Sequence, residues 1–110
     1  MATDVLAVLC TFPSSDEATS AGRALVEEGL AACANLCPGV TSVYRWQGQV
    51  VQDQEVLAII KTRADLFQAM RARLVALHSY DVPEVIALPV VDGHEPYLDW
   101  LRSSTRGSSA

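Results

Sequence analysis

Residues 41–62, TSVYRWQGQVVQDQEVLAIIKT, constrain the fold more than any other stretch of the chain. β-Branched and aromatic residues dominate this stretch, which is typical of two strands joined by a polar turn, either at 47–49 or at 52–54. The first strand alternates between two different faces, whereas residues 56–60 are apolar on both faces. A hairpin of this kind predicts a sheet that has to be covered on both sides.

The segments that flank the hairpin carry the signals of a small α+β domain. Ser14 and Glu17 have the spacing of a capping box at the start of a helix. The order strand, helix, strand, strand, helix, strand and final short helix is the ferredoxin-like split βαβ arrangement, with an antiparallel sheet and its helices on one face. The predicted elements are a strand at 5–12, a helix at 14–29, the hairpin within 32–62, a helix capped by Thr62 and ended by His78, a strand at 85–91, and a helix opened by Glu95 and Pro96.

The length of 110 residues and the composition of the C-terminus predict the domain organisation. A chain of this length can bury one core without a disulfide or a metal, so we expect a single domain over residues 1–103. The closing residues are polar and rich in Ser and Gly, which predicts a disordered tail over residues 104–110.

The sheet predicts an oligomer. Two helices in a domain of this size cover one face of a sheet, so the apolar positions on the other face need a different cover. An exposed apolar sheet face with a long hairpin invites association, and a copy of the same chain is the economical cover. We therefore expect a homo-oligomer.

Charge and cysteine content exclude several function classes. Thirteen acidic against eight basic residues give a net charge of −5, and the basic residues do not cluster, so neither nucleic acid nor a membrane is expected as a partner. The first residues have no positive charge ahead of a short apolar run, which argues against a signal peptide and for the cytoplasm. Three cysteines without a secretion signal predict reduced thiols. The usual enzyme motifs are missing, so an enzyme is not predicted.

Two kinds of side chain could bind a metal ion. Cys33 and Cys37 could offer soft sulfur ligands, which together with imidazole suit copper or zinc; the alternative is that they are small apolar fillers of a strand. His78 ends the second helix, where it could ligate a transition metal with Asp81 or Glu84 as its carboxylate partner, or simply complement the helix dipole.

Other side chains could bind an anion or a partner. Lys61 precedes a helix start and could receive an anionic ligand together with the free backbone N–H groups there, or it could be a strand lysine with its head in water. Trp46 is most simply a packing or interface anchor, Tyr80 a turn residue and Glu84 a solvated carboxylate.

Several segments together resemble one family. AACANLCPGVTSVYRWQGQV, EVLAIIKT, HSYDVPEVIALPV and the closing YLDWL are similar, in order and spacing, to the CutA divalent-cation tolerance family. The resemblance covers nearly the whole chain except the Ser/Gly tail. It implies a ferredoxin-like protomer in a compact homotrimer related in architecture to the PII signalling proteins, with the long hairpin extending the sheet of a neighbour.

The resemblance also implies a function and a site. The function is tolerance to copper and other divalent cations. The site is a polar cluster near the subunit boundary, with His78 and Cys33 as the copper(II) ligands, and carried over by motif it comprises Cys33, Trp46, Lys61, His78, Tyr80 and Glu84. One departure is Ser79, which stands where the family usually has proline, so we expect the backbone before Tyr80 to be freer and the presentation of His78 to differ from the family pattern.

These observations leave three functional hypotheses. The first is a cytoplasmic homotrimer that binds copper(II) or another divalent cation weakly and takes part in metal tolerance. The second is a PII-like sensor that holds a small anionic metabolite in the cleft between subunits through Lys61. The third is a trimeric interaction scaffold.

Overall fold

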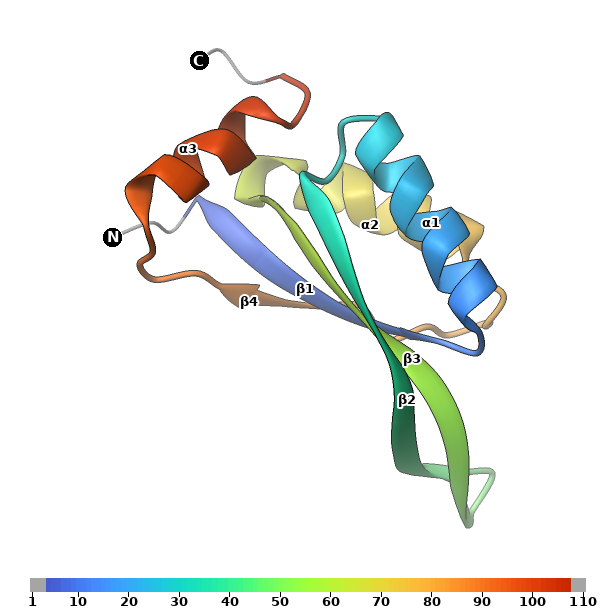
Figure 1. Cartoon of the computed structure of the whole chain (residues 1–110). Coiled ribbons are helices and arrows are strands. Elements are labelled where there is room, and N and C mark those ends of the chain that lie inside the picture. Colours follow the sequence, from blue (N-terminus) through green and yellow to red (C-terminus); the bar gives the residue numbers. More distant parts are fainter. Residues whose placement is uncertain (1–3, 108–110) are drawn as a thin grey trace.

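A computed structural model, which describes residues 4–107, shows an antiparallel four-stranded sheet in the order β2-β3-β1-β4 with helices packed on it (Figure 1). This confirms the predicted α+β, ferredoxin-like arrangement. Among the described residues, no helix is both long enough and apolar enough to span a membrane. The elements are β1 (Val5–Phe12), α1 (Ser15–Glu27), β2 (Cys33–Trp46), β3 (Gln49–Arg63), the 3-10 turn η1 (Ala64–Leu66), α2 (Phe67–Leu77), β4 (Ile86–Pro89) and α3 (Glu95–Ser103).

The predicted hairpin is present, and its turn is the first of the two alternatives. Gln47 and Gly48 form the turn, and both have positive φ, at 50° and 79°. A shift in the β2–β3 register between Cys37 and Val40 marks a bulge after Cys37. The hairpin projects beyond the rest of the domain, so the molecule measures 48 Å along its longest axis against 25 and 22 Å across (Figure 1).

The start of the second helix differs from the prediction. Thr62 belongs to β3 and does not cap a helix; it is fully buried, and its Oγ1 donates a 2.7 Å hydrogen bond to the carbonyl of Leu30. The chain passes through η1 before α2 begins at Phe67. The prediction that Thr62 caps the helix was wrong because a strand end and a helix cap both favour a β-branched hydroxyl residue.

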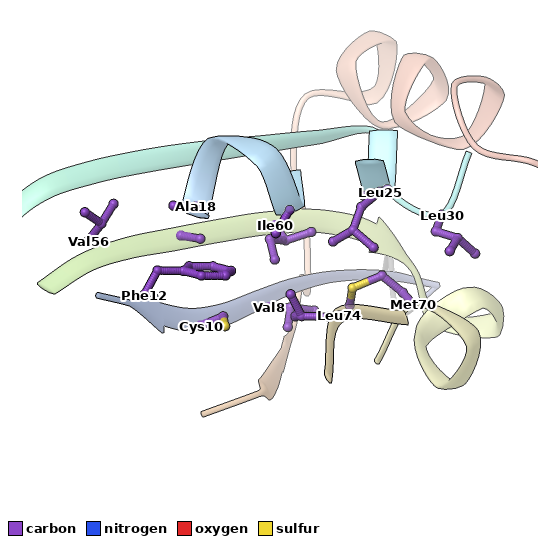
Figure 2. Close-up of a cluster of buried hydrophobic side chains, with 13 residues drawn as sticks. Val8, Cys10, Phe12, Ala18, Leu25, Leu30, Val56, Ile60, Met70 and Leu74 are labelled. Carbon is purple, nitrogen blue, oxygen red and sulfur yellow. The ribbon is translucent and has the colours of Figure 1, made fainter. Parts of the chain in front are cut away.

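One face of the sheet carries the main core. Side chains alternate along a strand, so residues 8, 10 and 12 of β1 and residues 56, 58 and 60 of β3 point to α1 and α2, and each of these six side chains is at most 5% exposed. Figure 2 shows them meeting the helices. The cluster comprises Val8, Cys10, Phe12, Ala18, Ala21, Leu25, Leu30, Ala31, Val56, Ala58, Ile60, Met70 and Leu74.

The opposite face of the sheet is only partly covered. We call it the open face; by strand register it comprises Ala7, Leu9, Thr11, Cys33, Asn35, Cys37, Leu57, Ile59, Lys61, Ile86 and Leu88. Ile86 is 50% exposed and Leu88 47% exposed. Helix α3 packs at one end of this face, where Leu98 and Leu101 bury Val5. The remaining apolar side chains of the open face have no second layer within the described chain.

The described part of the C-terminal segment contacts β3 and the end of α1. Thr105 is buried, and the Nη1 of Arg63 donates to its Oγ1 (3.1 Å) and to the carbonyl of Arg106 (3.0 Å). Arg63 also pairs with Asp65 at 2.6 Å, and the N–H of Arg106 donates to the carbonyl of Gly29. Thr105 and Arg106 are thus bound to the domain. The domain bounds and the tail over residues 104–110 stay predictions, and residues 108–110 lie outside the described residues.

Candidate functional site

His78 lies at the C-terminus of α2 with its side chain fully buried. Its Nε2 is 2.7 Å from the carbonyl oxygen of Thr11, and its Nδ1 is 3.1 Å from the backbone nitrogen of Tyr80. A carbonyl can only accept and a backbone N–H can only donate, so the ring carries its proton on Nε2 and is neutral. The imidazole also stacks on Phe12, with centroids 4.4 Å apart.

This environment changes the interpretation of His78 as a metal ligand. Both ring nitrogens are engaged inside the chain, so neither offers a free lone pair to an ion. The nearest carboxylate is Glu17, with Oε2 at 3.6 Å from Nδ1, and not Asp81 or Glu84 as predicted. Within one chain, His78 therefore makes the contacts of a buried structural histidine, and its role as a metal ligand stays a prediction.

Ser79 fixes the backbone where the family pattern has proline. Oε2 of Glu17 accepts hydrogen bonds from both the N–H (3.0 Å) and the Oγ (2.9 Å) of Ser79. Ser14 still accepts a bond from the N–H of Glu17, so the first half of the predicted capping box is present, but the carboxylate of Glu17 reaches the 78–85 connection. The backbone before Tyr80 is thus held by a bidentate contact that a proline, which lacks an N–H, could not make in full.

Tyr80 is bound to the hairpin. Its hydroxyl donates a 2.7 Å hydrogen bond to Glu55, a carboxylate that is only 9% exposed. Partial burial, and next the bond to Glu55, raises the pKa of Tyr80 well above its usual range. Tyr44 donates to Asp53 nearby on the same hairpin, and mainly this bond raises the pKa of Tyr44.

Trp46 and Glu84 stand apart from the other predicted site residues. Trp46 is 60% exposed at the tip of the hairpin, thirteen positions along β2 from Cys33, which is roughly 40 Å at the rise of a strand. Glu84 is exposed and makes no hydrogen bond or ion pair within residues 4–107. One chain therefore does not bring the predicted polar cluster together.

Cys33 and Lys61 do meet, on the open face. They are cross-strand partners in the β2–β3 register, and α3 adds Tyr97 to them. The Sγ of Cys33 lies 3.7 Å from the Tyr97 hydroxyl and 3.9 Å from Oδ1 of Asn35, and the ammonium of Lys61 stands 5.7 Å from the centroid of the Tyr97 ring. The helix-start N–H of Ala64, which we expected to help Lys61 receive an anion, is instead bound to the carbonyl of Asp4.

Cys33 and Cys37 lie too far apart to bind one metal ion together. Cys33 and Cys37 both point to the open face because the bulge comes after Cys37, but four strand residues separate them by about 13 Å. His78, which stacks on Phe12, lies on the helix side of the sheet and so opposite Cys33. In residues 4–107, no three His, Cys, Asp or Glu side chains are arranged to hold a metal ion. Within residues 4–107, Cys33 thus lacks the neighbouring ligands that would complete a metal site.

Sequence reasoning missed three residues of this region. Glu17 was interpreted only as part of a helix cap, and Tyr97 only as an anchor of the last helix. Nothing in the sequence indicates the contact of Glu55, because a carboxylate within a polar strand segment is expected to face solvent unless its partner is known. Each of the three makes its contact with a residue at least 25 positions away in the chain.

Comparison with known proteins gives a consistent result. Residues 6–104 match the family model described as CutA1 divalent ion tolerance protein. The chain is 54% identical to the divalent-cation tolerance protein CutA of Thermus thermophilus, over 89% of this chain and 95% of that protein. It is 46% identical to protein CutA of Homo sapiens, over 96% of this chain but 59% of that protein. The chain also spans less than two thirds of the chloroplastic relatives from Arabidopsis thaliana and rice.

Solved structures agree with the fold. The divalent cation tolerance protein of Thermus thermophilus superposes with a TM-score of 0.89 at 52% identity, covering 92% of this chain and 98% of that one. CutA1 of Oryza sativa superposes with a TM-score of 0.93 at 45% identity, covering 97% of this chain and 98% of that one. The similarity therefore extends over sheet, hairpin and helices alike.

Proposed function

The chain belongs to the CutA1 divalent ion tolerance family, and from this premise we propose that it acts as a cytoplasmic homotrimer that binds divalent cations, copper(II) foremost, weakly at Cys33. The observation that carries the proposal is the position of the Cys33 thiol at one end of an apolar sheet face that one chain leaves uncovered. Three unpaired cysteines support a reducing compartment.

The open face supports self-association. Ile86 and Leu88 are about half exposed on it, and Val43 and Val50 of the projecting hairpin are 62% and 66% exposed. A second copy that covers these exposed apolar side chains and pairs with the free strand edges removes them from water, which stabilises the assembly. The number of copies, three, follows from the family resemblance.

Light scattering after gel filtration tests the assembly. We expect the wild type to elute at three times the mass of one chain, and Leu88→Asp to shift toward the single-chain mass, because a buried carboxylate opposes the contact. The exposed position Val82 lies outside the open face, so Val82→Asp is the matched control and should leave the mass unchanged. A single-chain mass for the folded wild type at micromolar concentration would contradict the proposal.

The chemistry of Cys33 supports the choice of metal. Copper(II) stands highest in the affinity order of divalent first-row ions for nitrogen and sulfur ligands. Cys33 is a partly buried thiol that faces the surface at which another copy can add ligands. His78 is left out of the ligand set because its two ring nitrogens are already bound.

Calorimetric titration of the reduced protein with copper(II) tests the site. Cys33→Ser should weaken binding strongly, whereas Cys37→Ser, which removes a more exposed thiol from the same face, should leave it unchanged. His78→Gln should bind as the wild type does. A Cys33→Ser titration that matches the wild type would remove Cys33 as the ligand.

One observation favours a second candidate, the binding of a small anion. Lys61 forms no ion pair within residues 4–107, and its ammonium stands beside Cys33, where it repels a cation and attracts an anion. Lys61→Gln separates the two candidates because it should tighten copper binding if the ligand is a cation. If the ligand is an anion, the same change should abolish any thermal stabilisation by phosphate, sulfate or a nucleotide.

A further inference from the structure

The link between β4 and α3 contains an Asp–Gly pair, Asp92 and Gly93, and no other Asp–Gly pair occurs in the sequence. Residues 90–94 belong to no helix or strand, and both members of the pair are exposed. The side chain of Asp92 folds back on the backbone, so that its Oδ1 accepts a 2.9 Å hydrogen bond from the N–H of Gly93. The carboxyl carbon, one bond away from that oxygen, is thus held beside the backbone nitrogen of the next residue.

This arrangement brings together the two groups that form a succinimide. In that reaction the backbone nitrogen attacks the carboxyl carbon, a new C–N bond closes the ring, and the N–H proton leaves with the carboxyl hydroxyl as water. Proximity within one chain favours the closure. Water then opens the ring at one of its two carbonyls. Opening at the former side-chain carbonyl restores aspartate, whereas opening at the backbone carbonyl leaves isoaspartate, in which the main chain runs through the former side chain.

Gly93 leaves this ring closure unobstructed, because a glycine has no Cβ beside the attacking nitrogen. Asp81, in the connection before β4, is also exposed, but the next residue is Val82, whose branched Cβ crowds the nitrogen. Asp99 lies inside α3, where the backbone is held in its helical conformation. Among these three aspartates, only Asp92 combines exposure, an irregular backbone and a following glycine.

Isoaspartate would change the structure here because both ends of the link are fixed. The N–H of Val90 donates to the carbonyl of Val5 (3.0 Å), and the carbonyl of His94 accepts from the N–H of Leu98 (3.1 Å). Isoaspartate lengthens the backbone between these two points by one carbon–carbon bond, about 1.5 Å. Leu98 is 3% exposed and packs with Leu101 on Val5, and a gap of that size removes much of the attraction between packed side chains.

We propose that Asp92 is a site of spontaneous isomerisation to isoaspartate, and that the product loosens α3 from the sheet. The reaction consumes only water and the chain's own groups, so it does not depend on a bound metal ion. In isoaspartate a carboxylate stands directly on Cα. This group is the substrate of carboxyl methyltransferases that use S-adenosylmethionine, so an enzyme of that class would act on the aged protein.

Peptide mapping of metal-free protein, aged by warm incubation in the folded state, tests the modification. Trypsin releases one peptide, residues 74–102, that carries Asp81, Asp92 and Asp99 together. Isomerisation leaves the mass unchanged, so electron-capture fragmentation and methyl transfer from labelled S-adenosylmethionine identify isoaspartate. We expect it to accumulate at Asp92 and to stay at background at the other two positions, which serve as controls in the same molecules.

Three variants of the pair change the rate in different directions. Gly93→Ala adds a Cβ that would lie 3.4 Å from Leu98, an ordinary contact, so this variant folds and closes the ring more slowly. Asp92→Asn reaches the same succinimide faster, because ammonia leaves in place of water. Asp92→Glu should form no isoaspartate, because its longer side chain cannot close a succinimide ring.

Hydrogen exchange measures the effect on α3. We expect the amides of α3 to exchange faster in aged than in fresh wild type, while the amides of α1 keep their rate. Gly93→Ala aged in the same way is the matched control, since it undergoes every other change of the incubation. Methylation of isoaspartate lets the ester close to the succinimide with loss of methanol, so treatment with the methyltransferase and S-adenosylmethionine should restore part of the slow exchange.

Two results would contradict the proposal. If the folded wild type forms no more isoaspartate at Asp92 than at Asp81, the modification site is refuted, even if the urea-unfolded chain reacts there. If isoaspartate forms at Asp92 and the exchange of α3 is unchanged, the loosening of α3 is refuted. Neither result depends on the copper titration of Cys33, so a failure here is distinct from a failure of the proposed function.

Discussion

Removing the imidazole of His78 should cost the protein a large part of its stability. His78→Ala loses the bond to the Thr11 carbonyl and leaves the Tyr80 N–H without its acceptor, each worth about 1 kcal/mol when buried. The stack on Phe12 contributes about another 1 kcal/mol. We therefore expect the free energy of unfolding to fall by about 3 kcal/mol.

Urea denaturation followed by circular dichroism measures this change. All variants should be compared at one protein concentration, because self-association couples stability to concentration. His94, the only other histidine of the chain, is exposed, so His94→Ala is the matched control and should change the free energy by less than about 0.5 kcal/mol.

Two conservative variants apportion the loss. His78→Gln can place an N–H donor near Nε2, and His78→Asn can place an acceptor near Nδ1, so each should recover about 1 kcal/mol relative to alanine. Suppose instead that His78→Ala unfolds at the same urea concentration as His94→Ala. That result would show that the ring nitrogens do not make the hydrogen bonds to Thr11 and Tyr80, and His78 would again be a candidate metal ligand.

Three further predictions follow from described contacts. The Arg63 guanidinium, mainly through its hydrogen bonds, holds the pKa of Asp65 in the folded protein below its ordinary 3.8. The stabilisation is complete above 3.8 and is lost as the pH falls through the lowered pKa of the folded state, so the difference in unfolding free energy between wild type and Asp65→Asn should shrink on acid titration through that range. Burial raises the pKa of the Cys10 thiol to about 12, so at pH 8 iodoacetamide should label the exposed Cys37 and spare Cys10 until the protein is unfolded. Gly29→Ala should destabilise by about 1–3 kcal/mol in thermal melts, because φ is +73° there and a Cβ would lie 2.9 Å from the C-terminal segment.

The fold was predictable because its signals are local. Alternation in β1 and β3, the cap at Ser14 and the polar hairpin turn each act within a few residues, and the antiparallel order follows from their sequence. The exception is Thr62, where the end of a strand and the start of a helix share the same residue preference. Only its bond to Leu30, made 32 positions away, decides between the two.

The site was less predictable because its contacts join distant parts of the chain. A histidine at a helix end is equally suited to a metal and to a buried carbonyl, and the Thr11 carbonyl that binds His78 lies 67 positions earlier. The sequence of side chains does not indicate which backbone carbonyl accepts the hydrogen bond from the ring. For Cys33 the strand register was needed before its neighbours Lys61 and Tyr97 could be named.

The projecting hairpin has a consequence for how the molecule is made. Beyond residue 40 its two strands pair with each other and carry exposed valines on a ribbon with no helix behind it (Figure 1), and an isolated two-stranded ribbon is only marginally stable in water. In a newly synthesised copy we therefore expect the sheet and helices to fold first, while the two strands of the ribbon remain only marginally paired. Exchange of the ribbon's amide hydrogens with heavy water should therefore slow down when copies associate, and the time at which it slows reports the time of assembly.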